Sequence, residues 1–186
     1  MRKIILMMSV SLDGYIAGPN GEIDWHRVDE EVHAHMNEQL SPMGMFLDGR
    51  ITYQLMADFW PTADQDPAAS KAIADFARIW RDMPKIVYSR TLQQADWNTI
   101  VVHEVIADDV LRLKETPGGD LAVGGANLAA TFLRLELIDE VRLYVNPIAI
   151  GGGIPLFPVG EQIRLRLVDT RTFGNGVVLL RYERSD

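Results

Sequence analysis

The sequence contains no cysteine among its 186 residues. This absence excludes a disulfide scaffold, a thiolate nucleophile, and any zinc or iron-sulfur site that is ligated by cysteine. Basic residues are also few, with 18 Lys and Arg against 26 Asp and Glu, and the formal net charge is -8. Because nucleic acids and anionic membranes attract positively charged surfaces, we expect neither as a partner.

Long apolar runs are absent as well. The run at the N-terminus, residues 4–10, is far shorter than the roughly 18 apolar residues that a membrane span needs. It also lacks the small-residue cleavage site of a signal peptide. We therefore interpret it as a first strand and expect a cytoplasmic protein. The composition, 47% hydrophobic and 24% charged, is typical of a single compact domain, here residues 1–186.

Strand and helix patterns alternate along most of the chain. Short apolar runs predict strands at residues 4–10, 43–48, 85–89, 99–102, 121–123 and 140–150. Helical spacing predicts helices at residues 28–40, from Arg50 to Phe59, from Pro67 to the residue before Pro84, and at 108–115 and 126–135. For the helix that begins at Pro67, we expect Asp66 to be the N-cap.

The last part of the chain has a different pattern. Apolar and basic residues alternate over residues 163–167, and Gly174-Asn175-Gly176 separates this segment from the apolar residues 177–182. This pattern predicts an antiparallel hairpin. The sequence as a whole therefore predicts an α/β fold with a mostly parallel central sheet, flanking helices and a C-terminal antiparallel hairpin.

Three predicted strand-to-helix turns carry glycine or small hydroxyl residues where the carboxyl end of a strand meets the N-terminus of a helix. They are Gly49-Arg50-Ile51-Thr52, Ser89-Arg90-Thr91 and Gly124-Gly125-Ala126-Asn127. Where a strand leads into a helix, such a turn presents free backbone N–H groups and the positive end of the helix dipole to an anion. In any one of these turns, the small residues more commonly serve only to form the turn and bind no ligand. The prediction of a phosphate-bearing nucleotide therefore rests on all three turns together.

Other chemistries have little support. The chain contains neither a Gly-x-Gly-x-x-Gly fingerprint nor a P-loop. His33 and His35 are two residues apart, a spacing that directs them to different helix faces, and we expect no metal site. Ser9 and Ser11 have no base nearby in the sequence that would indicate a hydrolase triad.

A set of motifs, taken in order, resembles the riboflavin-biosynthesis reductase (RibD C-terminal domain) family, whose fold is similar to that of dihydrofolate reductase. The resemblance covers about residues 3 to 183. The motifs are Ser11-Leu-Asp-Gly-Tyr-Ile-Ala17, Gly49-Arg50-x-Thr52-Tyr53, Phe59-Trp60-Pro61, Lys85-x-Val-x-Ser89-Arg90-Thr91, Val123-Gly124-Gly125, Asp139-Glu140 and Pro147-x-x-x-Gly151-Gly-Gly-x-Pro-Leu-Phe157.

The resemblance implies a reductase that uses NADPH and acts on a small heterocyclic or sugar-linked substrate, similar to 5-amino-6-(5-phosphoribosylamino)uracil reductase. The alternatives are a dihydrofolate or pterin reductase and a catalytically inactive NADP-binding protein. The implied cofactor-binding residues are Ile16, Ala17, Gly49, Arg50, Thr52, Ser89, Arg90, Thr91, Val123, Gly124, Gly125, Ala126 and Asn127. The resemblance further implies a cis peptide between Gly124 and Gly125, substrate contacts from Ser9, Trp25 and Asn146, and a homodimer.

Two positions depart from the family pattern. Asp48 replaces a residue that is usually apolar, and Gln54 replaces a frequent Glu. The proton-handling residue has two candidates, because counting forward from Trp25 reaches Glu30, whereas counting back from Gly49 reaches His33. These two are three residues apart and share a helix face, and either can act as a general acid. We expect the dimer contact at residues 147–157. A zinc deaminase of the kind that accompanies such reductases is not encoded here, because its cysteine ligands are missing.

Overall fold

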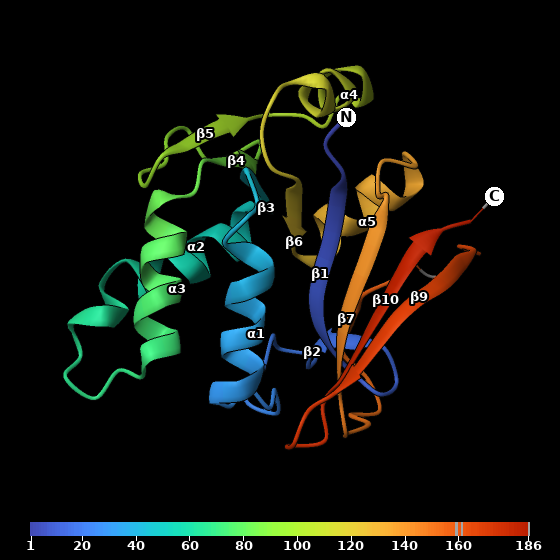
Figure 1. The fold of residues 1–186 in the computed structure, drawn as a ribbon. Coiled ribbons are helices and arrows are strands. Elements are labelled where there is room, and N and C mark those ends of the chain that lie inside the picture. Colours follow the sequence, from blue (N-terminus) through green and yellow to red (C-terminus); the bar gives the residue numbers. More distant parts are fainter. Residues whose placement is uncertain (159, 161, 186) are drawn as a thin grey trace.

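The computed structural model describes residues 1–158, 160 and 162–185. Its centre is an eight-stranded sheet with the order β5-β4-β3-β6-β1-β7-β10-β9 (Figure 1). Neighbouring strands from β5 to β7 are parallel, whereas β10 is antiparallel to both β7 and β9. The strands are β1 Ile4–Ser11, β3 Met45–Gly49, β4 Lys85–Tyr88, β5 Thr99–Val102, β6 Leu121–Gly124, β7 Glu140–Asn146, β9 Leu165–Thr172 and β10 Val178–Arg184. The predicted fold class is confirmed.

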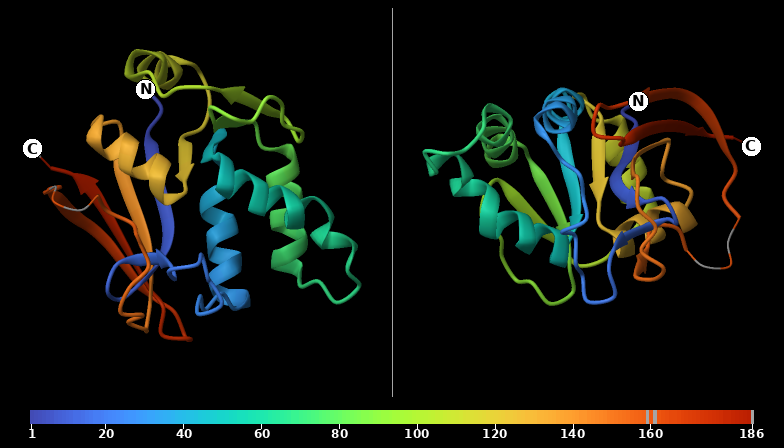
Figure 2. Two further views of the ribbon diagram at one scale, coloured as in Figure 1. Left: turned by 180° about the vertical axis from the view of Figure 1, so that it is seen from behind. Right: turned by 90° about the horizontal axis from the view of Figure 1, so that it is seen from below.

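Helices cover both faces of the sheet (Figure 2). The helices are α1 Glu30–Leu40, α2 Arg50–Phe59, the 3-10 helix η1 Trp60–Gln65, α3 Lys71–Asp82, α4 Ala107–Glu115 and α5 Ala126–Arg134. Successive strand residues point to opposite faces. Accordingly, Phe46 packs in one core with Trp80 of α3, whereas its neighbour Leu47 packs in the other core with Phe132 of α5.

Two helices begin later than predicted. The carboxylate of Asp29 accepts a hydrogen bond from the Val32 amide at 3.0 Å, so α1 starts at Glu30. The predicted N-cap Asp66 was wrong. Its carboxylate closes a turn by accepting from the Ala68 amide at 2.8 Å, and the true N-cap of α3 is Ser70.

The loop that follows β1 contains a short strand that the sequence did not predict. β2 (Tyr15–Ala17) pairs with β8 (Ile154–Pro155) in a separate two-stranded sheet. Gly153 makes this pairing possible, because its φ is +150° and a Cβ at this position would overlap the carbonyl of Ala17. The predicted strand 140–150 ends early, at Asn146, because Pro147 follows and has no N–H for the ladder.

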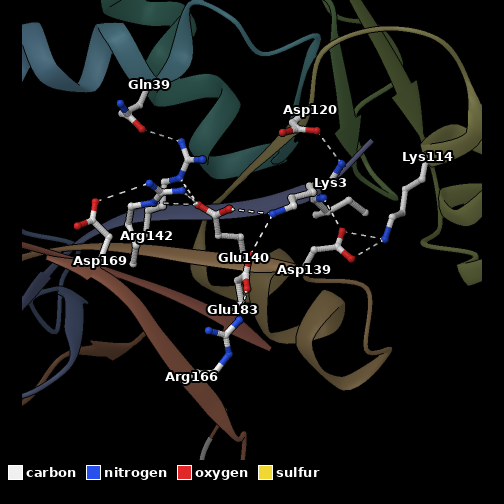
Figure 3. A network of polar contacts seen from close by, with 12 residues as sticks. Lys3, Gln39, Lys114, Asp120, Asp139, Glu140, Arg142, Arg166, Asp169 and Glu183 are labelled. Carbon is white, nitrogen blue, oxygen red and sulfur yellow. Dashed lines mark hydrogen bonds and ion pairs between the residues drawn. The ribbon is translucent and has the colours of Figure 1, made fainter. Parts of the chain in front are cut away.

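A network of ion pairs lies where β7 begins, beside β1 and β10 (Figure 3). Its centre is Glu140, whose side chain is 3% exposed. Glu140 accepts hydrogen bonds from Arg142 at 2.6 Å and from Arg181 at 3.0 Å, and Lys3 lies 3.5 Å away. Burial acts to raise the pKa of Glu140, but these two arginines outweigh it and leave the pKa lowered. The ionised form is therefore held by the folded protein.

We predict that Glu140→Ala lowers the free energy of unfolding by about 3 kcal/mol at pH 7, because two arginines lose a buried partner. The lowered pKa means that this contribution is present above the unfolded-state pKa and is lost as the pH falls through the folded-state value. Urea unfolding at pH 7 and pH 3 measures both effects. The control is Glu183→Ala, which removes more exposed pairs with Lys3 and Arg166 and should cost less than about 1 kcal/mol. Equal losses from the two variants contradict the prediction.

Candidate functional site

Two helices begin side by side at the carboxyl ends of the central strands. β3 pairs with β6 so that Asp48 lies opposite Gly124. The residue after Asp48 is Gly49, the N-cap of α2, and the residue after Gly124 is Gly125, the N-cap of α5. Neither helix has a side-chain cap or an acidic residue in its first turn. The first-turn N–H groups and the positive dipole ends of both helices are therefore available to an anion.

The N-termini of the other α-helices, α1, α3 and α4, are compensated. Asp29 caps α1 and Ser70 caps α3 through side-chain hydrogen bonds. α4 has no side-chain cap, but Asp108 and Asp109 occupy its first turn. Among the described helices, only α2 and α5 thus combine a glycine N-cap with an uncompensated first turn. The prediction that these two turns join a strand to a helix is confirmed.

The glycine pair at the start of α5 packs closely against α2. Gly125 has a φ of +89°, and a Cβ on it would overlap the hydroxyl of Thr52. A Cβ on Gly124 would lie 2.7 Å from the carboxylate of Asp48. The expected cis peptide between the two glycines is wrong, because no peptide bond in the described residues is cis and the positive φ of Gly125 makes the turn.

The third predicted turn, Ser89-Arg90-Thr91, has a different structure from the one expected. It joins β4 to a loop before β5, so no helix begins there. The Ser89 hydroxyl accepts hydrogen bonds from the amides of Thr91 at 3.2 Å and Leu92 at 3.0 Å, so these N–H groups are already satisfied. Arg90 is exposed, and no other described residue hydrogen-bonds or pairs with its guanidinium. An anion at this turn would be held by the Arg90 side chain rather than by a helix end.

Asp48 is a buried acid at the base of the glycine pair. Its exposed fraction is 6%, and none of the described residues donates a hydrogen bond to its carboxylate. Burial raises the pKa of Asp48 to about 7, although Lys85 on β4 opposes the shift. The sequence marked Asp48 as unusual but assigned it no role.

Lys85 is the buried cation that acts on Asp48. Its ammonium donates to the carbonyls of Met83 at 2.8 Å and Trp97 at 2.9 Å, and it lies 4.3 Å from the ring centroid of Trp80. Burial lowers the pKa of Lys85 to about 8, and Asp48 and Asp82 oppose that shift. Since its hydrogen bonds go to carbonyls, Lys85 acts on Asp48 through charge alone.

The two candidates for proton handling lie together at the start of α1. Glu30 is exposed and accepts a hydrogen bond from the Ala72 amide at 3.1 Å. His33 packs edge-on against Trp60, with ring centroids 5.7 Å apart, and close to Phe76. Burial lowers the pKa of His33, and Glu30 opposes the shift. Both residues therefore stay candidates.

Ser9 and Asn146, two of the residues expected to contact the substrate, lie on β1 and β7. Asn146 also contacts the loop that precedes α1. The buried amide of Asn146 donates to the Ser9 hydroxyl at 3.0 Å and accepts from the Arg27 amide at 2.7 Å. The side-chain amide of Asn146 is therefore hydrogen-bonded inside the protein and holds the loop before α1, and its contact with the substrate stays a prediction. Trp25 is half-buried and packs edge-on against His26, with ring centroids 4.2 Å apart.

Ile16 and Ala17, two of the expected cofactor-binding residues, lie on β2. The carbonyl of Ile16 is 3.2 Å from Nε2 of His26, which connects β2 to the segment that carries Trp25. Ala17 is buried, and Ile16 is half-buried against the core. The loop after β1 is therefore paired with β8 in the two-stranded sheet and is joined through His26 to the segment that precedes α1.

The RibD C-terminal domain profile matches residues 2–179 of this sequence. The chain belongs to the RibD C-terminal domain family. Two Bacillus subtilis proteins are similar over nearly their whole lengths. YyaP is 38% identical over 183 residues, which are 97% of this chain and 94% of YyaP. YwjB is 29% identical over 182 residues, which are 96% of each chain.

Solved structures share the fold at lower identity. A putative riboflavin biosynthesis protein from Shewanella sp. PV-4 has a TM-score of 0.72 at 23% identity, with both chains fully covered. The deaminase/5-amino-6-(5-phosphoribosylamino)uracil reductase of Thermotoga maritima has a TM-score of 0.67 at 16% identity, and 57% of its chain is covered by 99% of this one. The dihydrofolate reductase of Enterococcus faecalis, solved with NADP(H), has a TM-score of 0.67 at 14% identity, with 99% of this chain and 97% of that chain covered. The expected likeness to dihydrofolate reductase is confirmed for the fold.

Other expectations concern membranes, metals and assembly. In the described part of the chain, no helix has the length and apolar character to cross a membrane. In that same part, no three His, Asp or Glu side chains gather as a metal site would require. The homodimer stays a prediction. Its expected contact region, residues 147–157, exposes Ile148 and Ile154.

We predict that Asp48→Asn makes the folded state less sensitive to pH. A carboxyl whose pKa is raised to about 7 on folding binds more protons in the folded state, so stability falls as the pH rises from about 4 to 7. The loss approaches about 1.4 kcal/mol per pH unit within that window. The variant lacks this loss and should be more stable than the parent at pH 8 by about 2 kcal/mol.

Urea unfolding at pH 5 and pH 8 measures this difference. Asp58→Asn, at an exposed position on α2, is the control and should follow the parent at both pH values. An Asp48→Asn variant that loses as much stability as the parent between the two pH values contradicts the prediction.

Proposed function

We propose that this protein is an NADPH-dependent reductase that transfers a hydride to a carbonyl or carbon–nitrogen double bond of a small heterocyclic or sugar-linked substrate. One observation carries the proposal. The two adjacent, uncompensated helix N-termini of α2 and α5 lie at the carboxyl edge of the sheet, and ligands of open α/β sheets bind at that edge. Membership of the RibD C-terminal domain family supports this proposal.

The residues of this edge fit a dinucleotide phosphate. The first turns of α2 and α5, including Gly49, Arg50 and Thr52 together with residues 123–127, would bind the pyrophosphate through backbone N–H groups. Exposed Arg90 would bind the 2'-phosphate, because a guanidinium offers a planar fork of donors. Ile16 and Ala17 would cover the nicotinamide, which supplies the hydride.

The protein's own part in the reaction is orientation and proton supply. Hydride addition to the substrate carbon leaves the neighbouring nitrogen or oxygen in need of a proton. Glu30 or His33 would deliver that proton as a general acid. The products are NADP+ and the reduced substrate, so the two electrons and both hydrogens are accounted for.

The names of the structural neighbours suggest two substrate classes. The Thermotoga maritima protein is named for an aminouracil substrate that carries a phosphoribosyl group, and we favour this class because of the family match. A dihydrofolate or pterin is the alternative, because nearly the whole Enterococcus faecalis dihydrofolate reductase chain is covered. An NADP-binding protein without catalysis is the remaining alternative.

The first test is a calorimetric titration of the parent protein with NADPH and NADH. We predict submillimolar binding of NADPH, and we predict that Arg90→Ala weakens NADPH about tenfold while NADH changes less than twofold. Arg78→Ala is the control, since it removes an exposed arginine of α3 and should leave the affinity for both nucleotides unchanged. Failure to bind either nucleotide at submillimolar concentration rejects the reductase. Equal losses for both nucleotides show that Arg90 does not bind the 2'-phosphate.

The second test addresses proton supply. NADPH oxidation is followed at 340 nm against a panel of aminouracil ribosyl phosphates, dihydrofolate and dihydropterins. Replacing the general acid, by Glu30→Gln or His33→Gln, should lower kcat about 100-fold while leaving the Kd for NADPH unchanged. Glu38→Gln, on an exposed position of α1, is the control and should keep the parent rate. Full activity in both variants excludes both residues, and no oxidation with any substrate favours the protein without catalysis.

A further inference from the structure

His103 lies beside Arg90 at the edge of the sheet. β4 and β5 are parallel, with Tyr88 opposite Val102, so the residues that follow these two strands are neighbours. The Ser89 amide donates to the Val102 carbonyl at 2.9 Å, and Nδ1 of His103 lies 2.9 Å from the Ser89 carbonyl. Because a carbonyl oxygen only accepts, Nδ1 of His103 must carry the proton in this bond.

This bond leaves Nε2 as the free nitrogen of the ring. His103 is exposed, and no other described residue hydrogen-bonds to it or pairs with it. The same is true of the Arg90 guanidinium. The carbonyl that accepts from His103 belongs to the peptide bond between Ser89 and Arg90. The hydrogen bond therefore holds the imidazole close to the backbone of Arg90.

Arg90 has no partner among the described residues and His103 has one free ring nitrogen, on a chain whose formal net charge is -8. Other basic side chains nearby are already paired, as Arg112 is with Asp109 in the first turn of α4. Glu104, which follows His103, is the adjacent carboxylate in the chain. A guanidinium and an imidazole together match a terminal phosphate, whose several oxygens accept hydrogen bonds from more than one donor.

We propose that His103 is a second residue that binds the 2'-phosphate of NADPH, through Nε2, and so helps to determine specificity for NADPH over NADH. This inference rests on the proposed function. The Ser89 carbonyl accepts from Nδ1 and orients the ring, Nε2 of the imidazolium form would donate to the phosphate, and Arg90 would supply the permanent charge. No sequence motif indicates this role, because His103 is distant from Arg90 along the chain and only the pairing of β4 with β5 brings the two residues together.

Two substitutions separate contact with the ligand from support of the Ser89 turn. His103→Asn retains an amide nitrogen near the position of Nδ1, which can donate to the Ser89 carbonyl, but it has nothing in place of Nε2. His103→Gln reaches farther and can place a donor near the position of Nε2. Because His103 is exposed, we expect both variants to fold.

The experiment is calorimetry on the full chain with two matched ligands, 2',5'-ADP and 5'-ADP, which differ in the 2'-phosphate. We expect His103→Asn to weaken 2',5'-ADP about fivefold and His103→Gln to weaken it less, with 5'-ADP changed less than twofold in both. The ratio of NADPH to NADH affinity should fall by the same factor as the affinity for 2',5'-ADP.

Three outcomes overturn the inference. Unchanged binding of 2',5'-ADP in His103→Asn shows that Nε2 makes no contact. Equal losses for 2',5'-ADP and 5'-ADP show a general disturbance of the edge. A parent protein that binds neither NADPH nor NADH removes the proposed function and this inference with it, whereas normal binding by the parent with no effect of either His103 variant removes this inference alone.

Discussion

The close approach of α2 to the glycine pair at the start of α5 is the contact on which the candidate site depends. The register of β3 with β6 sets Asp48 opposite Gly124 and thereby places the two helix N-termini together. A side chain at Gly125 would overlap Thr52, so the two helices can begin this close only because the turn has none. A shift in either strand would separate the two dipole ends, and their combined field would be lost.

Charged side chains are paired with one another at one end of the sheet and lack such partners at the other. At the amino end, Glu140 and its arginines form a paired network that joins β7 to β10. At the carboxyl end, Arg90 and His103 have no partner at their ligand-facing atoms, and Asp48 is buried without a donor. Of these three groups, only the buried Asp48 carboxylate carries a desolvation cost, because Arg90 and His103 are exposed to water. Under the proposed function, this distribution distinguishes a structural end of the sheet from a binding end.

The sequence predicted the strands well because a parallel sheet buries both faces of its strands and leaves continuous apolar runs. It predicted the glycine turns of α2 and α5 for a local reason, since a strand end, a glycine and a helix follow one another in the chain. It failed at Ser89, where a hydroxyl caps its own turn and no helix follows. It also missed β2 and His103, because both depend on segments that are far apart in the sequence and are joined only by strand pairing.

The residues at the carboxyl edge of the sheet differ in how freely they can be substituted. Thr52 and the glycine pair are packed against each other, so substitution there disturbs the start of both α2 and α5. Arg90 and His103 lie outside the described core clusters and are exposed in the segments that follow β4 and β5. Exposed side chains can be replaced with little effect on stability. Under the proposed function, recognition of the pyrophosphate would therefore be built into the fold, whereas recognition of the 2'-phosphate would be carried by side chains that can vary without cost to the core.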